Sequence, residues 1–338
     1  MRAYVMTRYG GPEVMELRDV PAPRPGPGEV LIKVGAAGLN PVDYKMRQGK
    51  LRVLFRPRLP FIAGCELAGT VVGTGAGPTH FAEGDRVYSR VDAPALGAFA
   101  DFVCVPQELV ALMPQSLGFV EAAGLPLAGL TALQALRDEL RIQPGSRLFI
   151  SGGAGGVGTL AIQLGKYFGA DVTTTASPRG AALVRRLGAD HVVDYTREEF
   201  PDTLRGFDAA LDAVGGGSLR GIFRVLKRGG SVVSVAGIPE PQTALKDLHA
   251  SRALAVLFWI ISLGVRLRAR RYGVSYRYLF MHASGEDLRF LARLIDDGKI
   301  GPVVDTTYPL VRIAEAFAQL EAGSAKGKIV VTMDDAGR

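Results

Sequence analysis

Residues 38–46, GLNPVDYKM, bring four reactive side chains into one short stretch. Asn40 carries an amide and Asp43 a carboxylate. Tyr44 carries a phenol and Lys45 an ammonium. Such a set could bind a metal ion or act on a substrate. It could also only turn the chain, because Asn-Pro-Val-Asp is a turn sequence in which the aspartate caps a helical turn. For Asp43 we favour the structural role.

A glycine-rich motif, GGAGGVG, follows the apolar run LFIS and precedes a helical stretch. It satisfies the pattern G-x-G-x-x-G within a strand–helix–strand unit, the context in which this pattern binds a dinucleotide. The glycines let the backbone turn tightly and approach a pyrophosphate, whose charge the helix N-terminus stabilises. This context disfavours a turn without a ligand. The predicted cofactor-binding residues are Gly153, Gly155, Gly156, Val157 and Gly158.

The next predicted strand ends in TTTASPRG, which bears on the choice of dinucleotide. An NAD site usually has an acid here, on the ribose 2′-hydroxyl, and this stretch has none. Ser177 and Arg179 suit a 2′-phosphate instead, so we predict NADPH. The alternative is that Arg179 only begins an exposed helix. Tyr195 either contacts the adenine ribose or phosphate or is a half-buried strand-end residue, and Val214 and Gly215 are expected to line the nicotinamide side.

The elements that must position these residues change along the chain. The first third contains β-branched or alternating runs such as AYVM, EVLIKV and GTVVGTG, which predict a compact, mostly antiparallel β domain. From about residue 146 strands and helices alternate, which predicts an α/β fold with a doubly wound parallel sheet of the Rossmann type. We expect one domain from residues 1–123 and 283–338 and a second from residues 124–282.

Composition sets limits on the kind of protein. With 338 residues, 48% hydrophobic and 22% charged, the chain is typical of a soluble protein with more than one core. The net charge of +7 attracts phosphates, nucleic acid or membrane surfaces, but the basic residues are mostly scattered, so no nucleic-acid partner is expected. Two cysteines and the lack of an apolar signal region favour a reduced, cytoplasmic protein.

Residues 251–272, SRALAVLFWIISLGVRLRARRY, combine an apolar run with a basic end. The apolar run 253–265 is too short to span a bilayer. Weak contact with a membrane surface through residues 253–271 is one interpretation. A cover for the active site and a subunit contact are two others. We favour a fourth, a buried helix that packs on the domain of residues 124–282.

Taken in order, several stretches resemble one known family over about residues 3–332: MRAYVMTRYGGPEVMEL, GLNPVDYKMRQG, PFIAGCELAGTVVGTG, GAFADFVCVP, EAAGLPLAGLTALQAL, GGAGGVG and GKIVV. The chain is similar to zinc-free medium-chain dehydrogenases/reductases of the quinone oxidoreductase (zeta-crystallin-like) type, and the NPVDYK form is similar to alkenal/enone reductases. The resemblance implies a GroES-like catalytic domain, a Rossmann NADPH domain and a homodimer.

The resemblance also bears on a metal. Zinc-containing members use a Cys where this chain has Asn40, a His where it has Cys65, and a further Cys near the domain junction, where residues 120–135 contain none. Two cysteines and four histidines at scattered positions offer no zinc spacing. We therefore expect no metal, and an acceptor that does not need one: the β-carbon of an α,β-unsaturated carbonyl, or alternatively a quinone.

The expected mechanism transfers a hydride from NADPH to that β-carbon. Lys45, or the Tyr44 hydroxyl, stabilises the enolate oxygen, unless Lys45 is an ordinary surface lysine. Asn40 orients the nicotinamide ribose or the substrate. The resemblance places Thr131 near the nicotinamide and Lys328 near the cofactor phosphates. The alternative of another class is an NADPH-binding protein with little catalysis that associates with RNA or membranes.

Overall fold

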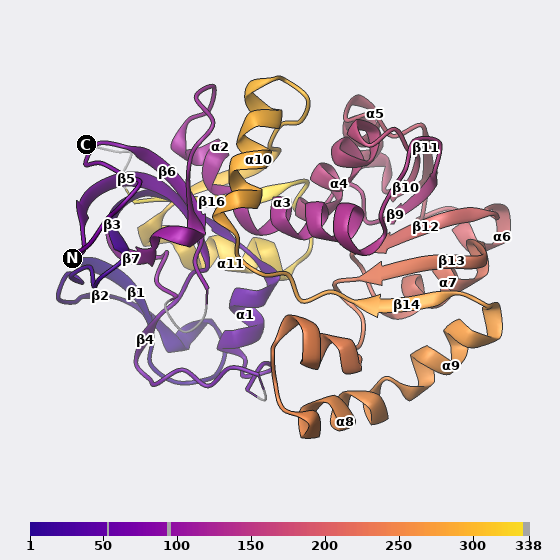
Figure 1. Cartoon of the computed structure of the whole chain (residues 1–338), viewed down its shortest axis with the longest axis horizontal. Helices are drawn as coiled ribbons and strands as arrows, with labels where there is room; N and C mark the ends of the chain where they lie inside the picture. The colour runs from indigo at the N-terminus through magenta and orange to yellow at the C-terminus, as the bar shows by residue number, and fades with distance from the viewer. Residues whose placement is uncertain (53, 93–95, 334–338) are drawn as a thin grey trace. The chain divides into compact units, whose positions relative to one another are not determined.

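The computed structural model describes residues 1–52, 54–92 and 96–333, and its contacts divide the chain into two units (Figure 1). Unit 1 comprises Met1–Leu130, Ala283–Gly298 and Pro302–Arg338, and unit 2 comprises Thr131–His282 and Lys299–Gly301. The first division falls after residue 130, not after residue 123. A hydrogen bond from the Leu127 N–H to Glu66 ties the start of helix α3 (Pro126–Leu133) to unit 1.

Unit 1 is rich in antiparallel strands, as the sequence predicted. Its larger sheet has the order β15-β16-β3-β5-β6-β8, with β7 also paired to β3, and a three-stranded sheet has the order β2-β1-β4. Only the β15–β16 pair is parallel among these described pairs. The strands are β1 (Arg2–Met6), β2 (Met15–Asp19), β3 (Glu29–Leu39), β4 (Phe61–Ile62), β5 (Glu66–Thr74), β6 (Arg86–Arg90), β7 (Phe102–Pro106), β8 (Val110–Leu112), β15 (Val304–Pro309) and β16 (Lys328–Thr332).

The core of unit 1 follows from the alternation in β3. Val30, Ile32 and Val34 point inward and are buried, whereas Lys33 between them is exposed. The inward residues belong to a hydrophobic cluster that also contains Phe99 and residues of helix α11 (Ile313–Glu321). The other helices of this unit are α1 (Pro41–Arg47), α2 (Phe119–Ala123) and α10 (Gly285–Asp296).

Unit 2 contains the predicted parallel sheet, with the order β11-β10-β9-β12-β13-β14. Leu148, Phe149 and Ile150 of β9 are all fully buried, so both faces of this strand are covered. The strands are β9 (Arg147–Ser151), β10 (Asp171–Ala176), β11 (His191–Asp194), β12 (Phe207–Asp212), β13 (Leu226–Ser234) and β14 (Ser275–Tyr278). The helices between them include α4 (Gly156–Tyr167), α5 (Pro178–Arg186), α6 (Phe200–Thr203) and α7 (Gly216–Val225).

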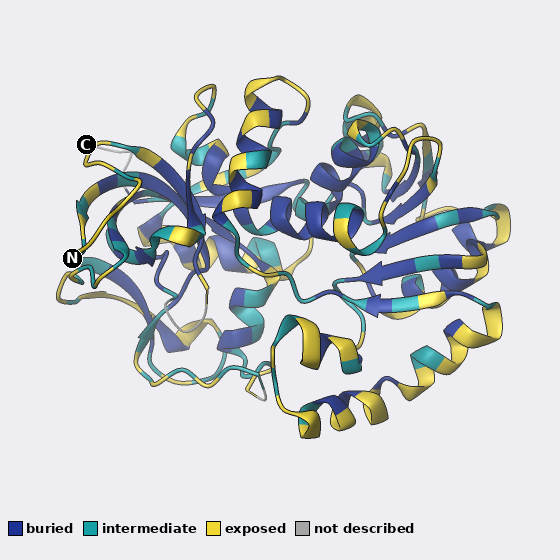
Figure 2. Cartoon of the chain, in the orientation of Figure 1, coloured by how far each residue is buried: buried dark blue, intermediate teal, exposed yellow. Residues whose placement is uncertain are grey.

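The segment 251–272 forms two consecutive helices, α8 (Arg252–Ile261) and α9 (Leu263–Tyr272). Our prediction of a buried helix is wrong: of α8 only Ala255 and Phe258 are buried, and most other side chains are exposed (Figure 2). These two residues lie one turn apart and form a single narrow buried face. The remaining apolar residues of α8 lie outside this face, so packing on one side cannot cover them.

Candidate functional site

Three polar residues that are distant in the sequence meet at one end of the β3 strand. In the sheet of unit 1, β3 lies between β16 and β5 and is antiparallel to both. The C-terminal end of β3 therefore lies beside the first residues of β16 and β5, which are Lys328 and Glu66. Asn40 follows β3 directly, so the strand pairing brings Asn40, Glu66 and Lys328 together.

Lys328 is at the centre of this group, which we call the Lys328 cluster (Asn40, Asp43, Cys65, Glu66 and Lys328). Its Nζ atom donates to the Leu39 carbonyl at 2.9 Å, to Asn40 Oδ1 at 2.5 Å and to Glu66 Oε1 at 2.6 Å. An ammonium has three donors, so all three are used. Asn40 completes the arrangement, because its Nδ2 atom donates to Glu66 Oε1 at 2.7 Å.

Glu66 is fully buried, and both of its carboxylate oxygens are paired. Its Oε2 atom accepts from the Leu127 N–H at 2.7 Å. The neighbouring strand makes room for it at Gly38, where a Cβ atom would lie 2.2 Å from Glu66 Oε1. A glycine two residues before Asn40 is therefore required by the position of the carboxylate.

Asp43 has the structural role that we favoured. Its Oδ2 atom accepts from the Asn40 backbone N–H at 2.8 Å, which closes the first turn of helix α1. Burial raises the pKa of Asp43 to about 7, and the Asn40 N–H, the Cys65 thiol and the Lys328 ammonium oppose this shift. Burial also raises the pKa of the Cys65 thiol well above its usual range, so Cys65 is a protonated, inaccessible thiol and not a nucleophile.

The Lys328 cluster does not fit a zinc ion. Within residues 1–52, 54–92 and 96–333, no three His, Cys, Asp or Glu side chains are grouped so that they could hold a metal. A dication near Asn40 and Glu66 would also lie close to the Lys328 ammonium, and the two cations would repel each other. The Lys328 cluster is therefore not a zinc site, and the absence of zinc from the chain stays a prediction.

The burial of Asn40 and Lys328 bears on the roles that we predicted for them. The two residues are 2% and 6% exposed, and their side-chain polar groups already have partners inside unit 1. A ribose, substrate or phosphate contact would compete with these bonds. The predicted contacts of Asn40 and Lys328 with the ribose, the substrate and the cofactor phosphates stay predictions. Within unit 1 the same hydrogen bonds fix the start of helix α1.

Tyr44 and Lys45, on α1, are the two predicted catalytic residues that keep accessible polar groups. Both are half-buried, and Tyr44 packs against the core of unit 1. Among the described residues, neither the Tyr44 hydroxyl nor the Lys45 ammonium has a hydrogen-bond or ion-pair partner. Burial lowers the pKa of Lys45, and the nearby Lys50 ammonium lowers it further. Lys45 is thus a cation whose proton is held less tightly than usual.

In unit 2 the predicted cofactor residues gather at one edge of the sheet. All its strands are parallel, so their carboxyl ends share that edge. The glycine motif follows β9, Ser177 and Arg179 follow β10, Tyr195 follows β11, and Val214 and Gly215 follow β12. The described backbone therefore brings these residues to one place, although each comes from a different loop.

The glycines of the motif serve different purposes. A Cβ atom at Gly153 would lie 2.1 Å from Thr174 Oγ1, and one at Gly158 would lie 2.3 Å from the Gly152 carbonyl oxygen, so packing requires both. At Gly155 the nearest such atom is 3.4 Å away, which is an ordinary contact. Gly155 is also the N-cap of α4, whose first turn, with Gly156 and Val157, has no side-chain cap. A ligand phosphate explains both features.

Ser177 and Arg179 lie where a ribose phosphate would need donors. Ser177 is the N-cap of α5 and makes no capping hydrogen bond with its side chain, and Arg179 is exposed in the first turn of the same helix. Tyr195 is 55% exposed, so it is not the half-buried strand-end residue that we considered as an alternative. These three residues present a hydroxyl, a guanidinium and a phenol at the edge of the sheet, a set that suits a dianionic phosphate.

Asp212, which sequence reasoning missed, shapes the loop that carries Val214 and Gly215. It is fully buried at the end of β12. Its Oδ1 atom accepts from Ser151 Oγ at 3.0 Å and from the Gly215 N–H at 2.9 Å, and its Oδ2 atom accepts from Ser234 Oγ at 2.7 Å. Asp212 thus ties together the carboxyl ends of β9, β12 and β13. An acid that ends an otherwise apolar strand was the available signal.

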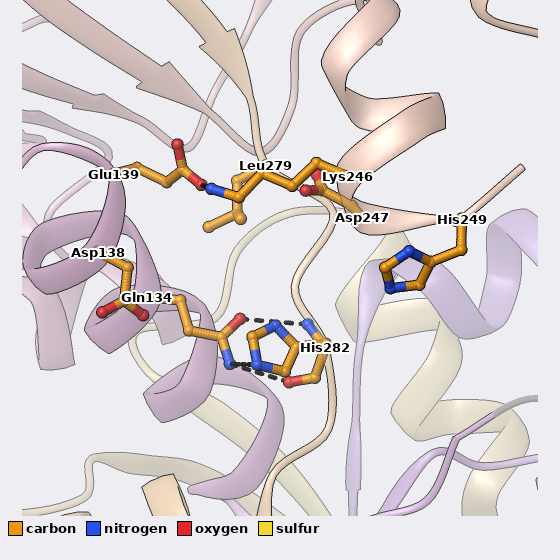
Figure 3. Close-up of a pocket in the computed structure, with 8 residues that line it drawn as sticks. All are labelled: Gln134, Asp138, Glu139, Lys246, Asp247, His249, Leu279 and His282. Carbon is orange, nitrogen blue, oxygen red and sulfur yellow. Dashed lines mark hydrogen bonds and ion pairs between the residues drawn. The ribbon is translucent and has the colours of Figure 1, made fainter. Parts of the chain in front are cut away.

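A cavity of about 280 Å³ lies in unit 2 and was also not predicted (Figure 3). Its walls include Gln134 and Glu139 of the π-helical segment η3 (Gln134–Glu139), His249, and His282, which follows β14. Gln134 Nε2 donates to the His282 carbonyl at 3.0 Å, and Gln134 Oε1 accepts from the His282 N–H at 3.1 Å. Thr131 is buried one turn before Gln134, and its predicted place near the nicotinamide stays a prediction.

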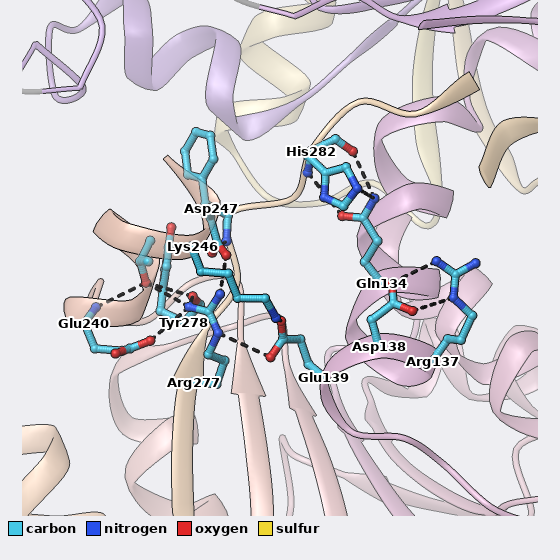
Figure 4. Close-up of polar contacts among 12 residues, drawn as sticks. Gln134, Arg137, Asp138, Glu139, Glu240, Lys246, Asp247, Arg277, Tyr278 and His282 are labelled. Carbon is cyan, nitrogen blue, oxygen red and sulfur yellow. Dashed lines mark hydrogen bonds and ion pairs between the residues drawn. The ribbon is translucent and has the colours of Figure 1, made fainter. Parts of the chain in front are cut away.

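A buried arginine organises one side of this cavity (Figure 4). Arg277 of β14 donates to Glu240 at 2.9 Å and to Glu139 at 3.3 Å, and it also pairs with Asp247. Lys246 adds a second cation on Glu139. Three carboxylates thus surround one guanidinium, which makes this wall rigid.

Comparisons with known proteins show which family the chain resembles. Residues 26–115 match the family of the alcohol dehydrogenase GroES-like domain, and residues 187–331 match that of zinc-binding dehydrogenases. Over 98% of its length the chain is 37% identical to a chloroplastic NADPH-dependent alkenal/one oxidoreductase of Arabidopsis thaliana and 36% identical to a 2-methylene-furan-3-one reductase of Solanum lycopersicum, covering 79% of each.

A solved structure leads to the same family. The quinone oxidoreductase of Coxiella burnetii is 32% identical and superimposes with a TM-score of 0.85 over 99% of both chains. The name of the second matching family refers to zinc, whereas the Lys328 cluster does not fit that metal. The GroES-like and Rossmann-type folds expected from the sequence are confirmed, and the chain belongs to the medium-chain dehydrogenase/reductase family.

Proposed function

We propose that this protein is an NADPH-dependent oxidoreductase that reduces the carbon–carbon double bond of α,β-unsaturated carbonyl compounds. The observation that carries the proposal is the Lys328 cluster. A buried ammonium, held by Asn40 and Glu66, takes the place of a metal donor set. Reaction at a carbonyl or alcohol that depends on a metal alkoxide is not supported by such a site, whereas the β-carbon of an enone is already electrophilic. The names of the two curated relatives support the same acceptor class.

The residues of unit 2 fit NADPH. Bound there, NADPH supplies the hydride. Gly155 leaves room for the pyrophosphate, and the first turn of α4 has the N–H groups that a helix N-terminus leaves without intrahelical partners. Ser177 and Arg179 would hold the 2′-phosphate, and Tyr195 would cover the adenine ribose. Val214, which is 57% exposed on a loop fixed by Asp212, lines the nicotinamide side.

Lys45 provides the catalytic hydrogen bond in unit 1. As the hydride reaches the β-carbon, negative charge develops on the carbonyl oxygen of the substrate, and the Lys45 ammonium donates to that oxygen. Tyr44 is the second candidate donor. The α-carbon then takes a proton, and the product is the saturated ketone. The lowered pKa of Lys45 favours Lys45 as the source of this proton, directly or through water.

An assay with three pairs of substrates tests the proposal. NADPH oxidation is measured with a short-chain enone and with a simple quinone, and the enone is also tried with NADH. We expect fast oxidation of NADPH by the enone and slower oxidation of NADH. Turnover with the quinone alone would favour a quinone reductase, the activity named for the solved relative. Tight NADPH binding without any turnover would favour a binding protein instead.

Two further properties belong to the proposal. We propose a homodimer, which the resemblance implies and which the position of β14 at one edge of the unit 2 sheet allows, since an edge strand can pair with another chain. Light scattering coupled to size exclusion tests this. We also propose a reducing, cytoplasmic location, because Cys65 and Cys104 are both free thiols.

A further inference from the structure

Helices α8 and α9 carry an unusual concentration of exposed apolar side chains. Figure 2 shows that most residues of both helices are exposed. The described residues expose seventeen large hydrophobic side chains, and eight of these fall between residues 256 and 272. Val256, Ile260 and Leu267 are among the most exposed, at 58%, 57% and 53%. We call these eight side chains the α8–α9 patch. A soluble protein rarely gathers so many without a partner surface.

The same segment carries a strong positive charge. Residues 251–272 contain Arg252, Arg266, Arg268, Arg270 and Arg271 and no Asp or Glu. This segment therefore has a net charge of +5, whereas the whole chain has +7. Cations also lie directly beside the apolar residues, because the Arg266 guanidinium is 5.8 Å from the centre of the Trp259 ring. Apolar and cationic groups thus share one surface.

We propose that the α8–α9 patch docks this protein on the surface of a membrane that contains anionic phospholipids. The apolar side chains enter the boundary between headgroups and acyl chains, and the arginines bind lipid phosphates. Trp259, which is 48% exposed, has the amphipathic ring that prefers this boundary. Among the described residues no helix is long and apolar enough to cross a bilayer, so docking parallel to the surface is the mode that fits.

Charge argues against a second copy of the chain as the occupant. A symmetric dimer that buried this patch would place the same surface on both sides of the contact. The five arginines of one copy would then face the five of the other, with no acidic residue in either segment to separate them. An anionic lipid surface supplies the missing negative charge.

Trp259 is the only tryptophan of the chain, so tryptophan emission, excited at a wavelength that tyrosine does not absorb, reports on the patch. The full-length protein is titrated with vesicles of phosphatidylcholine that contain about one quarter phosphatidylserine, and with vesicles of phosphatidylcholine alone. We expect a blue shift of the emission and co-sedimentation with the anionic vesicles only. Raising the salt concentration should weaken both, because lipid charges are then screened.

Paired variants distinguish the effect of this surface on vesicle binding from the effect of the overall charge or hydrophobicity of the protein. Removing two charges with Arg270→Gln/Arg271→Gln should lower the partition coefficient about 30-fold. Its control is Arg185→Gln/Arg186→Gln, which removes two exposed charges at the end of α5 and should have little effect. Ile260→Ser/Leu267→Ser should abolish the blue shift. Its control is Leu112→Ser/Val311→Ser, which replaces two exposed apolar residues outside the patch and should leave the blue shift unchanged.

Three results would overturn the proposal. Equal loss of binding in the α5 control would mean that only net charge matters. No response to anionic vesicles at low salt would remove the lipid surface as the partner. A blue shift that depends on protein concentration without vesicles would identify a second copy as the occupant. Because NADPH oxidation is assayed without lipid and these variants leave the proposed catalytic residues intact, the docking proposal can fail while the enzyme assignment stands.

Discussion

The Lys328 ammonium lies 2.6 Å from the Glu66 carboxylate, and the two side chains are only 7% and 0% exposed. The residues are 262 positions apart in the sequence and meet because β16, β3 and β5 are neighbours in one sheet. A charge pair without water depends on both partners, since either charge alone is strongly destabilising in the interior. This pair therefore contributes both to the stability of unit 1 and to the position of helix α1.

Lys328→Met should lower the free energy of unfolding by about 3–5 kcal/mol, because it leaves the Glu66 carboxylate buried without a cation. Urea denaturation measures the loss. The double variant Lys328→Met/Glu66→Gln should recover most of that stability, since the remaining amide is neutral. If the double variant is no more stable than the single one, the pair does not act as described.

Asp43 should make the folded protein less stable as the pH rises, which is the opposite of the usual effect of an aspartate. Its pKa is about 7 in the folded chain, whereas an aspartate free of such burial has a pKa of 3.8, so the folded state binds more protons than the unfolded state between these values. Stability therefore falls as the pH rises from 4 to 7, by at most about 4 kcal/mol for this group.

The control for this effect is Asp43→Asn, which keeps an oxygen for the Asn40 N–H but does not titrate. Relative to this variant, the wild-type protein should become progressively less stable between pH 4 and pH 8. Thermal unfolding of both proteins over that range gives the comparison. Parallel stability curves would show that Asp43 does not carry the raised pKa.

Gly155→Ala should separate cofactor binding from folding. No atom lies closer than 3.4 Å to the added methyl group, so the loss of stability should stay below about 1 kcal/mol. Binding of NADPH, measured by titration calorimetry, should weaken at least about tenfold if the pyrophosphate approaches this position. Gly158→Ala is the contrasting variant and should destabilise the fold. Unchanged NADPH affinity in Gly155→Ala would remove this loop from the cofactor site.

Arg179→Ala should raise KM for NADPH about 10- to 100-fold and leave KM for NADH nearly unchanged, because only NADPH has the 2′-phosphate. Arg185→Ala, at the other end of α5, is the matched control. Steady-state kinetics with both cofactors gives the ratio. A similar rise for both cofactors would contradict the phosphate assignment.

Lys45→Met should lower kcat with an enone about 100-fold while KM for NADPH changes little, since the ammonium acts on the developing oxyanion. Lys50→Met is the control. It should leave kcat near the wild-type value and shift the pH profile to higher pH, because the Lys50 charge helps to lower the pKa of Lys45. An unchanged kcat in Lys45→Met would exclude it from the reaction.

The sequence predicted those parts of the structure that depend on local pattern. The strand RLFIS is β9, the glycine motif follows it, and the alternation of strands and helices predicted the parallel sheet of unit 2. Because parallel strands place their carboxyl ends together, Ser177, Arg179 and Tyr195 could be assigned to one edge from the sequence alone.

What the sequence could not predict depends on contacts between distant segments. The resemblance placed Lys328 near the cofactor phosphates, and nothing local in the sequence shows that strand pairing also places its ammonium on Asn40 and Glu66. Residues 251–272 were expected to be buried because they are hydrophobic. A helix that is apolar on most of its sides, however, cannot bury all of these sides in one contact. The carboxylates around Arg277 come from three separate segments and had no common signal.

The measurement that tests the central claim most directly follows the hydrogen itself. The protein is given an enone and NADPH that carries deuterium at both positions of the nicotinamide C4 atom, and the product is identified by mass spectrometry and NMR. We predict a saturated ketone with one deuterium on its β-carbon and none on its α-carbon. An allylic alcohol with deuterium on the former carbonyl carbon would contradict the account, because the hydride would then have gone to the carbonyl and not to the double bond.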